Sequence, residues 1–187
     1  HGVTLDYGPF GFVEQFDPQY ICNHSDHQGR YAFNKQPEIG LFNLSCLAQA
    51  LLPIIHEDTD EAVKLAQTAL AEYQEIFVTH YAELMAAKLG LSKTEDGDQQ
   101  LLTSLQDLLE ANHVDYTLFF RKLSHLPSDE NKNSCRDLFI DRDAFDQWFL
   151  KYENRLTHEN IFPELRSEQM KKVNPKFILR NYMAEIA

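Results

Sequence analysis

The chain has 187 residues, of which 43% are hydrophobic and 25% charged, a composition typical of one globular domain. Its 29 acidic and 17 basic residues give a formal net charge of −12. No basic run is interleaved with aromatic residues, so we expect no nucleic-acid binding. We also find no signal peptide and no apolar run of the length that spans a bilayer, so we expect no membrane interaction.

The first 37 residues are predicted to form a loop-rich head. They hold four of the seven glycines and show no helical period. Val3–Leu5 is predicted to form a short strand that stops at the turn-forming run Asp6-Tyr7-Gly8-Pro9. The long irregular segment from Gly11 to Gln36 is rich in aromatic residues, which favours an ordered functional loop over disorder.

Residues 38–187 are predicted to be almost entirely helical, which makes the fold class mainly α within a single domain. The long helix is expected to bury one stripe, formed by Ala62, Ala66, Ala69, Tyr73, Ile76, His80 and Leu84. The first expected helices are one over 44–55 kinked by Pro53, and a long one with an acidic start at Asp58–Glu61 that Gly90 caps. Two more follow over 101–109 and 116–126, the second capped by Asp115. A mobile polar insertion is expected over 127–136, then a helix that Asp141 opens and a last helix starting at Asn174-Pro175.

The tripeptide Asp6-Tyr7-Gly8 is the first candidate for chemistry. A carboxylate at the end of a short strand, followed by Gly, can hold Mg²⁺ against nucleotide phosphates. A plain turn explains the same three residues when they are taken alone.

The loop after this turn offers two further candidates. The side chains of a zinc site occur at Cys22, His24, Asp26 and His27. A second, separated pair of ligands is lacking, so the competing interpretation is a partly buried thiol at Cys22. Arg30 could bind a carboxylate or phosphate through its planar fork, or it could tie the loop to the helices.

Two stretches carry a family resemblance. The first contains TLDYGPFGF at 4–12, ICNHSD at 21–26 and GRYAF at 29–33, and the second is VNPKFILRNY at 173–182. In this order they resemble the selenoprotein O family, the kinase-like proteins also called YdiU-type protein adenylyltransferases. The similarity is dense over 3–52 and 173–184 and looser between them.

The resemblance implies a protein-kinase-like fold in which 38–187 forms the helical lower lobe. It implies that Asp6 is the metal ligand, for Mg²⁺ or Mn²⁺, and contacts ATP, and that 11–37 corresponds to an activation loop. The implied reaction is transfer of AMP from ATP to Ser, Thr or Tyr of protein substrates. The implied location is cytoplasmic, or mitochondrial if the protein is eukaryotic.

The departures from the family pattern also carry predictions. The family's catalytic Asp-Asn pair lies upstream of the element at Asp6, and residues 1–5 do not supply it, so we name no catalytic residue here and expect the chain alone to be an inactive, pseudokinase-like piece. The family's regulatory disulfide would join Cys22 to a C-terminal cysteine beyond this chain, which gives Cys22 a redox role. We also expect the piece to self-associate. The alternatives are an ordinary protein kinase and a non-catalytic acidic helical interaction module.

Overall fold

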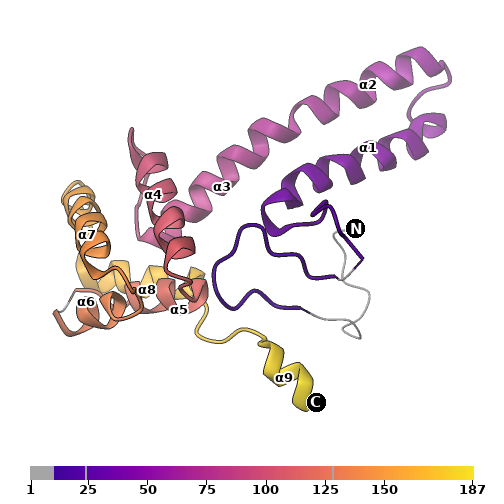
Figure 1. Ribbon diagram of the computed structural model, residues 1–187. Coiled ribbons are helices and arrows are strands. Elements are labelled where there is room, and N and C mark those ends of the chain that lie inside the picture. Colours follow the sequence, from indigo (N-terminus) through magenta and orange to yellow (C-terminus); the bar gives the residue numbers. More distant parts are fainter. Residues whose placement is uncertain (1–10, 24, 128) are drawn as a thin grey trace. The chain divides into compact units, whose positions relative to one another are not determined.

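A computed structural model describes residues 11–23, 25–127 and 129–187 (Figure 1). Every regular element in these residues is a helix, which confirms the mainly α class; the predicted strand at Val3–Leu5 lies outside them. The elements are η1 (Phe33–Lys35), α1 (Gln36–Ile55), α2 (Thr59–Ala71), α3 (Tyr73–Leu89), α4 (Asp98–Ala111), α5 (Tyr116–Leu123), α6 (Asp129–Arg136), α7 (Arg142–Leu156), α8 (Pro163–Val173) and α9 (Asn181–Ile186).

The chain packs as two compact units. Among the described residues, unit 1 comprises residue 11 with 18–23 and 25–80, and unit 2 comprises 12–17, 81–127 and 129–187. Helix α3 therefore contributes its first half to unit 1 and its second half to unit 2. The predicted functional boundary between 37 and 38 stays a prediction.

Unit 1 is built on α1 and α2, which lie side by side (Figure 1). Gly40 permits a close approach, because a Cβ there would stand 2.6 Å from the Tyr73 hydroxyl oxygen. That hydroxyl donates a hydrogen bond to the Pro37 carbonyl at 2.9 Å. The expected acidic start of α2 is a side-chain cap, in which the Asp58 carboxylate accepts from the Glu61 N–H at 3.0 Å.

The predicted single helix from Asp58 to Gly90 is two helices, α2 and α3, separated by one residue, Glu72. The predicted stripe is buried at Ala62 and Ala66 but not further along, since Ile76 is 50% exposed. The buried face of α3 is Met85, Ala86 and Leu89 instead. Apolar spacing identifies a helix face, but which turns of that face another element covers depends on tertiary packing.

The statement that no apolar run reaches the length of a membrane span is wrong for Phe33–Ile55. An 18-residue window within these 23 residues has a mean hydropathy of 1.6, and they form the one helix in the described residues that is long and apolar enough to cross a membrane. Glu38 is the one charged residue within α1, and the second half of the helix is mostly apolar. Length and composition alone are weak evidence for a span, because core helices of other proteins meet the same test.

Unit 2 has an aromatic core. The polar groups of two buried aromatic side chains donate hydrogen bonds to backbone carbonyls. Trp148 Nε1 donates to the Leu101 carbonyl at 3.1 Å, and the Tyr152 hydroxyl donates to the Leu89 carbonyl at 2.7 Å. The expected N-cap residues Asp115 and Asp141 accept from backbone N–H groups at the starts of α5 and α7. The largest fully buried side chains include Phe119, Phe120, Phe145, Phe149 and Tyr152.

The mobile insertion predicted at 127–136 contains helix α6, so that prediction is wrong over 129–136. Its one apolar side chain, Cys135, is fully buried. Arg136 Nε donates to the Asp146 carboxylate at 2.9 Å, and Lys122 Nζ donates to the Ser134 carbonyl at 2.9 Å. A polar segment is thus ordered by a few side-chain anchors. Ser128 lies outside the described residues.

The last helix begins at Asn181 and not at Asn174-Pro175 as predicted. Asn174 instead ends α8, a helix that the sequence did not indicate, with an extended backbone of φ −105° and ψ 99°. Its fully buried side chain donates to the Lys88 carbonyl at 2.9 Å and to Ser124 Oγ at 3.0 Å, and accepts from Lys88 Nζ at 2.9 Å. These tertiary partners explain why a new helix does not start there.

Candidate functional site

The predicted metal ligand Asp6 lies outside the described residues, as does His24. The part of the candidate site that the structure describes is therefore the segment that follows, Gly11–Lys35. Residues 12–17 of this segment belong to unit 2 and residues 18–35 to unit 1.

In unit 2, the segment is held by a residue from the far end of the chain. The Phe12 N–H donates to Asn181 Oδ1 at 2.8 Å, and Asn181 Nδ2 donates to the Phe12 carbonyl at 3.0 Å. The Asn181 N–H also donates to Glu14 Oε1 at 2.8 Å. We call these three residues the Asn181 clamp. Its reciprocal bonds satisfy both polar groups of one backbone residue, which restricts its position.

Residues at the start of α5 contact the chain next to both partners of the Asn181 clamp. The guanidinium of Arg180, next to Asn181, forms an ion pair with the Asp115 carboxylate at 2.6 Å. On the other side, the Phe16 N–H donates to the Val114 carbonyl at 2.8 Å, and the Phe16 ring stacks on Tyr116 at 5.2 Å. The Arg180 ion pair and the contacts of Phe16 therefore attach residues 12–16 to unit 2 at both ends.

In unit 1, backbone hydrogen bonds bring the two arms of the loop together. The Phe33 N–H donates to the Tyr20 carbonyl and the Asn34 N–H donates to that of Pro18, each at 2.9 Å. Gly11 approaches the same region closely, because a Cβ there would lie 2.8 Å from the Tyr20 hydroxyl oxygen and 3.2 Å from the Cys22 carbonyl oxygen. A larger residue at Gly11 would displace this arm.

The Asp26 carboxylate organises the turn at the tip of the loop. It accepts hydrogen bonds from the backbone N–H groups of Tyr31 at 2.7 Å and of Arg30 at 2.9 Å. The bond from Tyr31 is the main cause that holds the pKa of Asp26 below its ordinary value. Within the described part of the chain, no group of three His, Cys, Asp or Glu side chains is placed to hold a metal ion. The zinc alternative includes His24, outside that part.

Cys22 and Arg30 both lie on the described loop. The Cys22 thiol is free and exposed, so the alternative of a partly buried thiol at this position is wrong. Cys135 is free and buried, and burial raises the pKa of its thiol to about 12. The Arg30 guanidinium lies over the Phe42 ring of α1, 4.7 Å from its centroid, which is a contact between loop and helix. The redox role of Cys22 and the anchoring role of Arg30 stay predictions.

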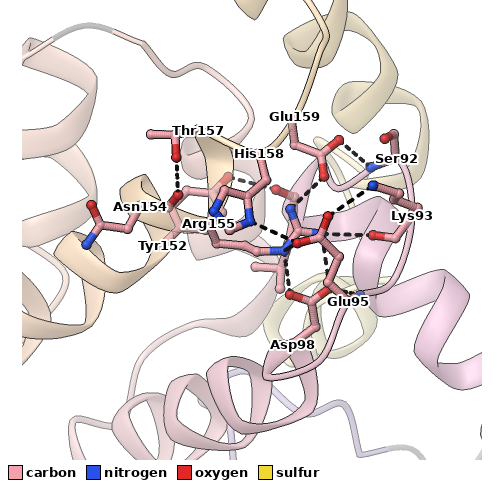
Figure 2. Close-up of polar contacts among 11 residues, drawn as sticks. Ser92, Lys93, Glu95, Asp98, Tyr152, Asn154, Arg155, Thr157, His158 and Glu159 are labelled. Carbon is pink, nitrogen blue, oxygen red and sulfur yellow. Dashed lines mark hydrogen bonds and ion pairs between the residues drawn. The ribbon is translucent and has the colours of Figure 1, made fainter.

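Sequence reasoning missed a polar cluster around Arg155, at the end of α7 (Figure 2). Arg155 is 8% exposed and donates to Asp98 at 2.6 Å, to Glu159 at 2.8 Å and to the Lys93 carbonyl at 2.9 Å. His158 Nδ1 lies 2.9 Å from Glu95 Oε2. In the sequence, the only indication of this cluster is the spacing of four residues between Arg155 and Glu159, which suits an ion pair on a helix.

The carboxylates of this Arg155 cluster are stabilised in their charged form. Hydrogen bonds from His158 and Lys93 lower the pKa of Glu95. Burial acts to raise the pKa of Glu159, but hydrogen bonds from Ser92 and Arg155 outweigh it and lower the pKa. With its acids paired, the cluster joins the loop before α4 to the end of α7, a structural role.

Comparisons with known proteins match the whole chain. The family model described as Protein adenylyltransferase SelO matches residues 1–187. Among curated proteins, "Protein nucleotidyltransferase YdiU" of Thioalkalivibrio sulfidiphilus is 47% identical over 186 residues, and that of Aliivibrio salmonicida is 49% identical over 187 residues. Each alignment covers 100% of this chain, which spans 38% and 37% of the length of these two relatives.

Proposed function

The chain belongs to the SelO family of protein adenylyltransferases, and on that premise we propose that this protein transfers AMP from ATP to Ser, Thr or Tyr hydroxyls of other proteins. The whole enzyme has a protein-kinase-like fold in this proposal, with residues 38–187 in its helical lobe. The names of the curated relatives support nucleotidyl transfer as the reaction class. The choice of AMP and of a hydroxyl acceptor rests on the family resemblance.

The observation that carries the proposal is the Asn181 clamp. It joins the two stretches that carry the resemblance, which are 169 residues apart in the sequence at the bonded pair. Phe12 lies six residues after Asp6, so the clamp restrains the segment that leads out of the proposed metal site. Small displacements of a reacting constellation cost large factors in rate, which gives such a restraint a role in catalysis.

In this proposal Asp6 supplies an oxygen ligand of the kind that Mg²⁺ and Mn²⁺ prefer. When bound, the ion offsets negative charge on the nucleotide phosphates. The residues that the structure describes have a supporting task. Asn181, Arg180 and Phe16 keep residues 12–16 in place against the start of α5.

The test uses the protein at the length of its relatives, incubated with Mg²⁺ and ATP labelled at either the α or the γ phosphate. We expect protein-bound label from the α phosphate only. Asp6→Ala removes it, and Asn181→Ala lowers kcat by about tenfold or more because the segment loses its restraint. The matched control is Asn133→Ala, an exposed asparagine on α6 that takes no part in the clamp.

The 187-residue chain is assayed beside the longer protein, and we expect it to incorporate no label. Label from the γ phosphate would replace the proposal with an ordinary protein kinase. No label from either position, in a folded protein, would favour the acidic helical interaction module. Equal rates for Asn181→Ala and Asn133→Ala would separate the clamp from catalysis.

A further inference from the structure

A pocket of about 550 Å³ opens in unit 2 between α6, α7 and α8. Its volume lies within the range of small-molecule sites, which is about 300–1,000 Å³. Most of its wall is apolar, and three charged side chains stand in it. The lining residues are Leu126, Pro127, Lys132, Phe149, Glu153, Leu156, Thr157 and Arg166.

Arg166 is the unusual member of this wall. It is only 8% exposed, and its stem carbons Cγ and Cδ would lie 2.8 and 3.0 Å from a Cβ on Gly90, so the stem is packed against the end of α3. No hydrogen bond or ion pair joins its guanidinium to any residue that the structure describes, in contrast to the equally buried Arg155 and its carboxylates.

The unpaired guanidinium still reaches open space. Among the described residues, Arg121 Nε is the only buried side-chain nitrogen or oxygen that is both sealed from solvent and without a partner. The nitrogens of Arg166 are therefore accessible, and the open space that Arg166 lines is this pocket. A buried cation without a partner is costly, and an anion bound in the pocket would remove that cost.

The charges of the wall indicate which anion fits. Lys132 Nζ already lies 3.7 Å from Glu153 Oε2 and 4.5 Å from the centroid of the Phe149 ring. That pair is close to neutral, so the two cations and one carboxylate leave a single positive charge, on Arg166. A monoanion matches this charge, whereas a phosphate dianion would exceed it and would face the Glu153 carboxylate.

We propose that this pocket binds a small molecule with one carboxylate and an apolar body. The carboxylate forms a bidentate pair with the Arg166 guanidinium, the geometry that a planar fork favours. The apolar body packs on Phe149, Leu126 and Leu156. This site is independent of Asp6 and of the proposed transfer reaction.

The probe for the test is 4-phenylbutyrate, titrated by calorimetry into the protein at the length of its relatives, with ligand-observed NMR as a second readout. We expect saturable binding with a Kd of about 0.1–1 mM, typical for a ligand of this size. The neutral 4-phenylbutan-1-ol and the dianionic phenyl phosphate should each bind at least about tenfold more weakly.

Two variants of the wall and one matched control locate the site. Arg166→Gln should weaken binding of 4-phenylbutyrate by about tenfold or more. Glu153→Gln should tighten it about threefold, because a like charge is removed and Lys132 is released. The control Arg142→Gln changes an arginine that is 53% exposed and paired with Asp137 on the surface, and it should leave the Kd unchanged.

Three outcomes would overturn the proposal: no saturable binding, equal binding of the alcohol, or an unchanged Kd in a folded Arg166→Gln protein. If Arg166→Gln does not fold, Glu153→Gln decides, because its side chain is 49% exposed and its removal spares the core. Tighter binding in that variant supports the site, and an unchanged Kd rejects it.

Discussion

Replacing Asn174 by Leu should loosen the centre of unit 2 while keeping the same number of side-chain heavy atoms. The fully buried amide of Asn174 connects the end of α3 to the end of α5 through Lys88 and Ser124. It also lies where α8 ends and the VNPKFILRNY stretch begins, so its bonds set the direction in which the chain leaves toward Asn181.

The magnitude follows from the three bonds that the substitution removes. The two neutral hydrogen bonds, to the Lys88 carbonyl and Ser124 Oγ, contribute about 1 kcal/mol each, and the bond from the charged Lys88 Nζ contributes about 2 kcal/mol. Burial of the leucine side chain offsets about 1 kcal/mol of that loss. We therefore expect local stability to fall by about 3 kcal/mol, a factor of about 100 in the opening equilibrium.

Hydrogen exchange followed by mass spectrometry measures this opening segment by segment without assuming that the whole protein unfolds in one step. In Asn174→Leu, peptides covering 84–92, 120–126 and 170–178 should exchange about 100-fold faster than in the parent protein. The control Asn133→Leu, an exposed residue of α6, should leave them unchanged. If Asn174→Leu changes protection in these three segments by less than about threefold, the reasoning that its amide holds them together is refuted.

Three further predictions concern the loop of the Arg155 cluster, the thiols and the exposed face of α1. Because the pKa of Glu95 is lowered in the folded state, its stabilisation is present above the ordinary value of 4.5 and is lost as the pH falls through the lower folded value. As the pH falls through that window, exchange of the loop before α4, corrected for intrinsic rates, should rise more in the parent protein than in Glu95→Gln, which lacks the titrating carboxyl; equal pH profiles would contradict this. Iodoacetamide at neutral pH should alkylate the exposed Cys22 and spare the buried Cys135, as read by mass spectrometry of the native protein; the reverse order would exclude this placement of the thiols. The 187-residue chain alone should self-associate in light scattering over about a tenfold range of concentration, and Ile54→Glu, at an 80% exposed site on α1, should reduce it; a clean monomer would refute the prediction.

Local chemistry was enough to predict the features that depend on neighbours in the sequence. The caps at Asp58, Asp115 and Asp141 form as expected, because a cap joins residues three apart in the chain. Gly90 ends α3 with a positive φ of 73°, the conformation for which glycine is favoured. The family was also identified from residues alone, through two long stretches in the right order.

Only the tertiary structure decided the features that depend on distant partners. Segment 129–136 reads as polar and mobile, yet Cys135 buries itself and Arg136 reaches Asp146, so a helix forms there. Asn174-Pro175 has the local signature of a helix start, but the bonds of Asn174 to other helices make it a helix end.

The candidate sites likewise combine features that the sequence predicts with features that only tertiary packing decides. The residue types at Asp6, Cys22 and Arg30 were enough to name them as candidates, because chemistry depends on the side chain. No pattern of neighbouring residues predicts that Asn181 bonds to Phe12 or that Arg166 is buried without a partner. Both features depend on which helices pack together. Short-range bonds are set by sequence spacing, whereas long-range contacts depend on the packing of the whole core, and that packing placed the Asn181 clamp and the Arg166 pocket.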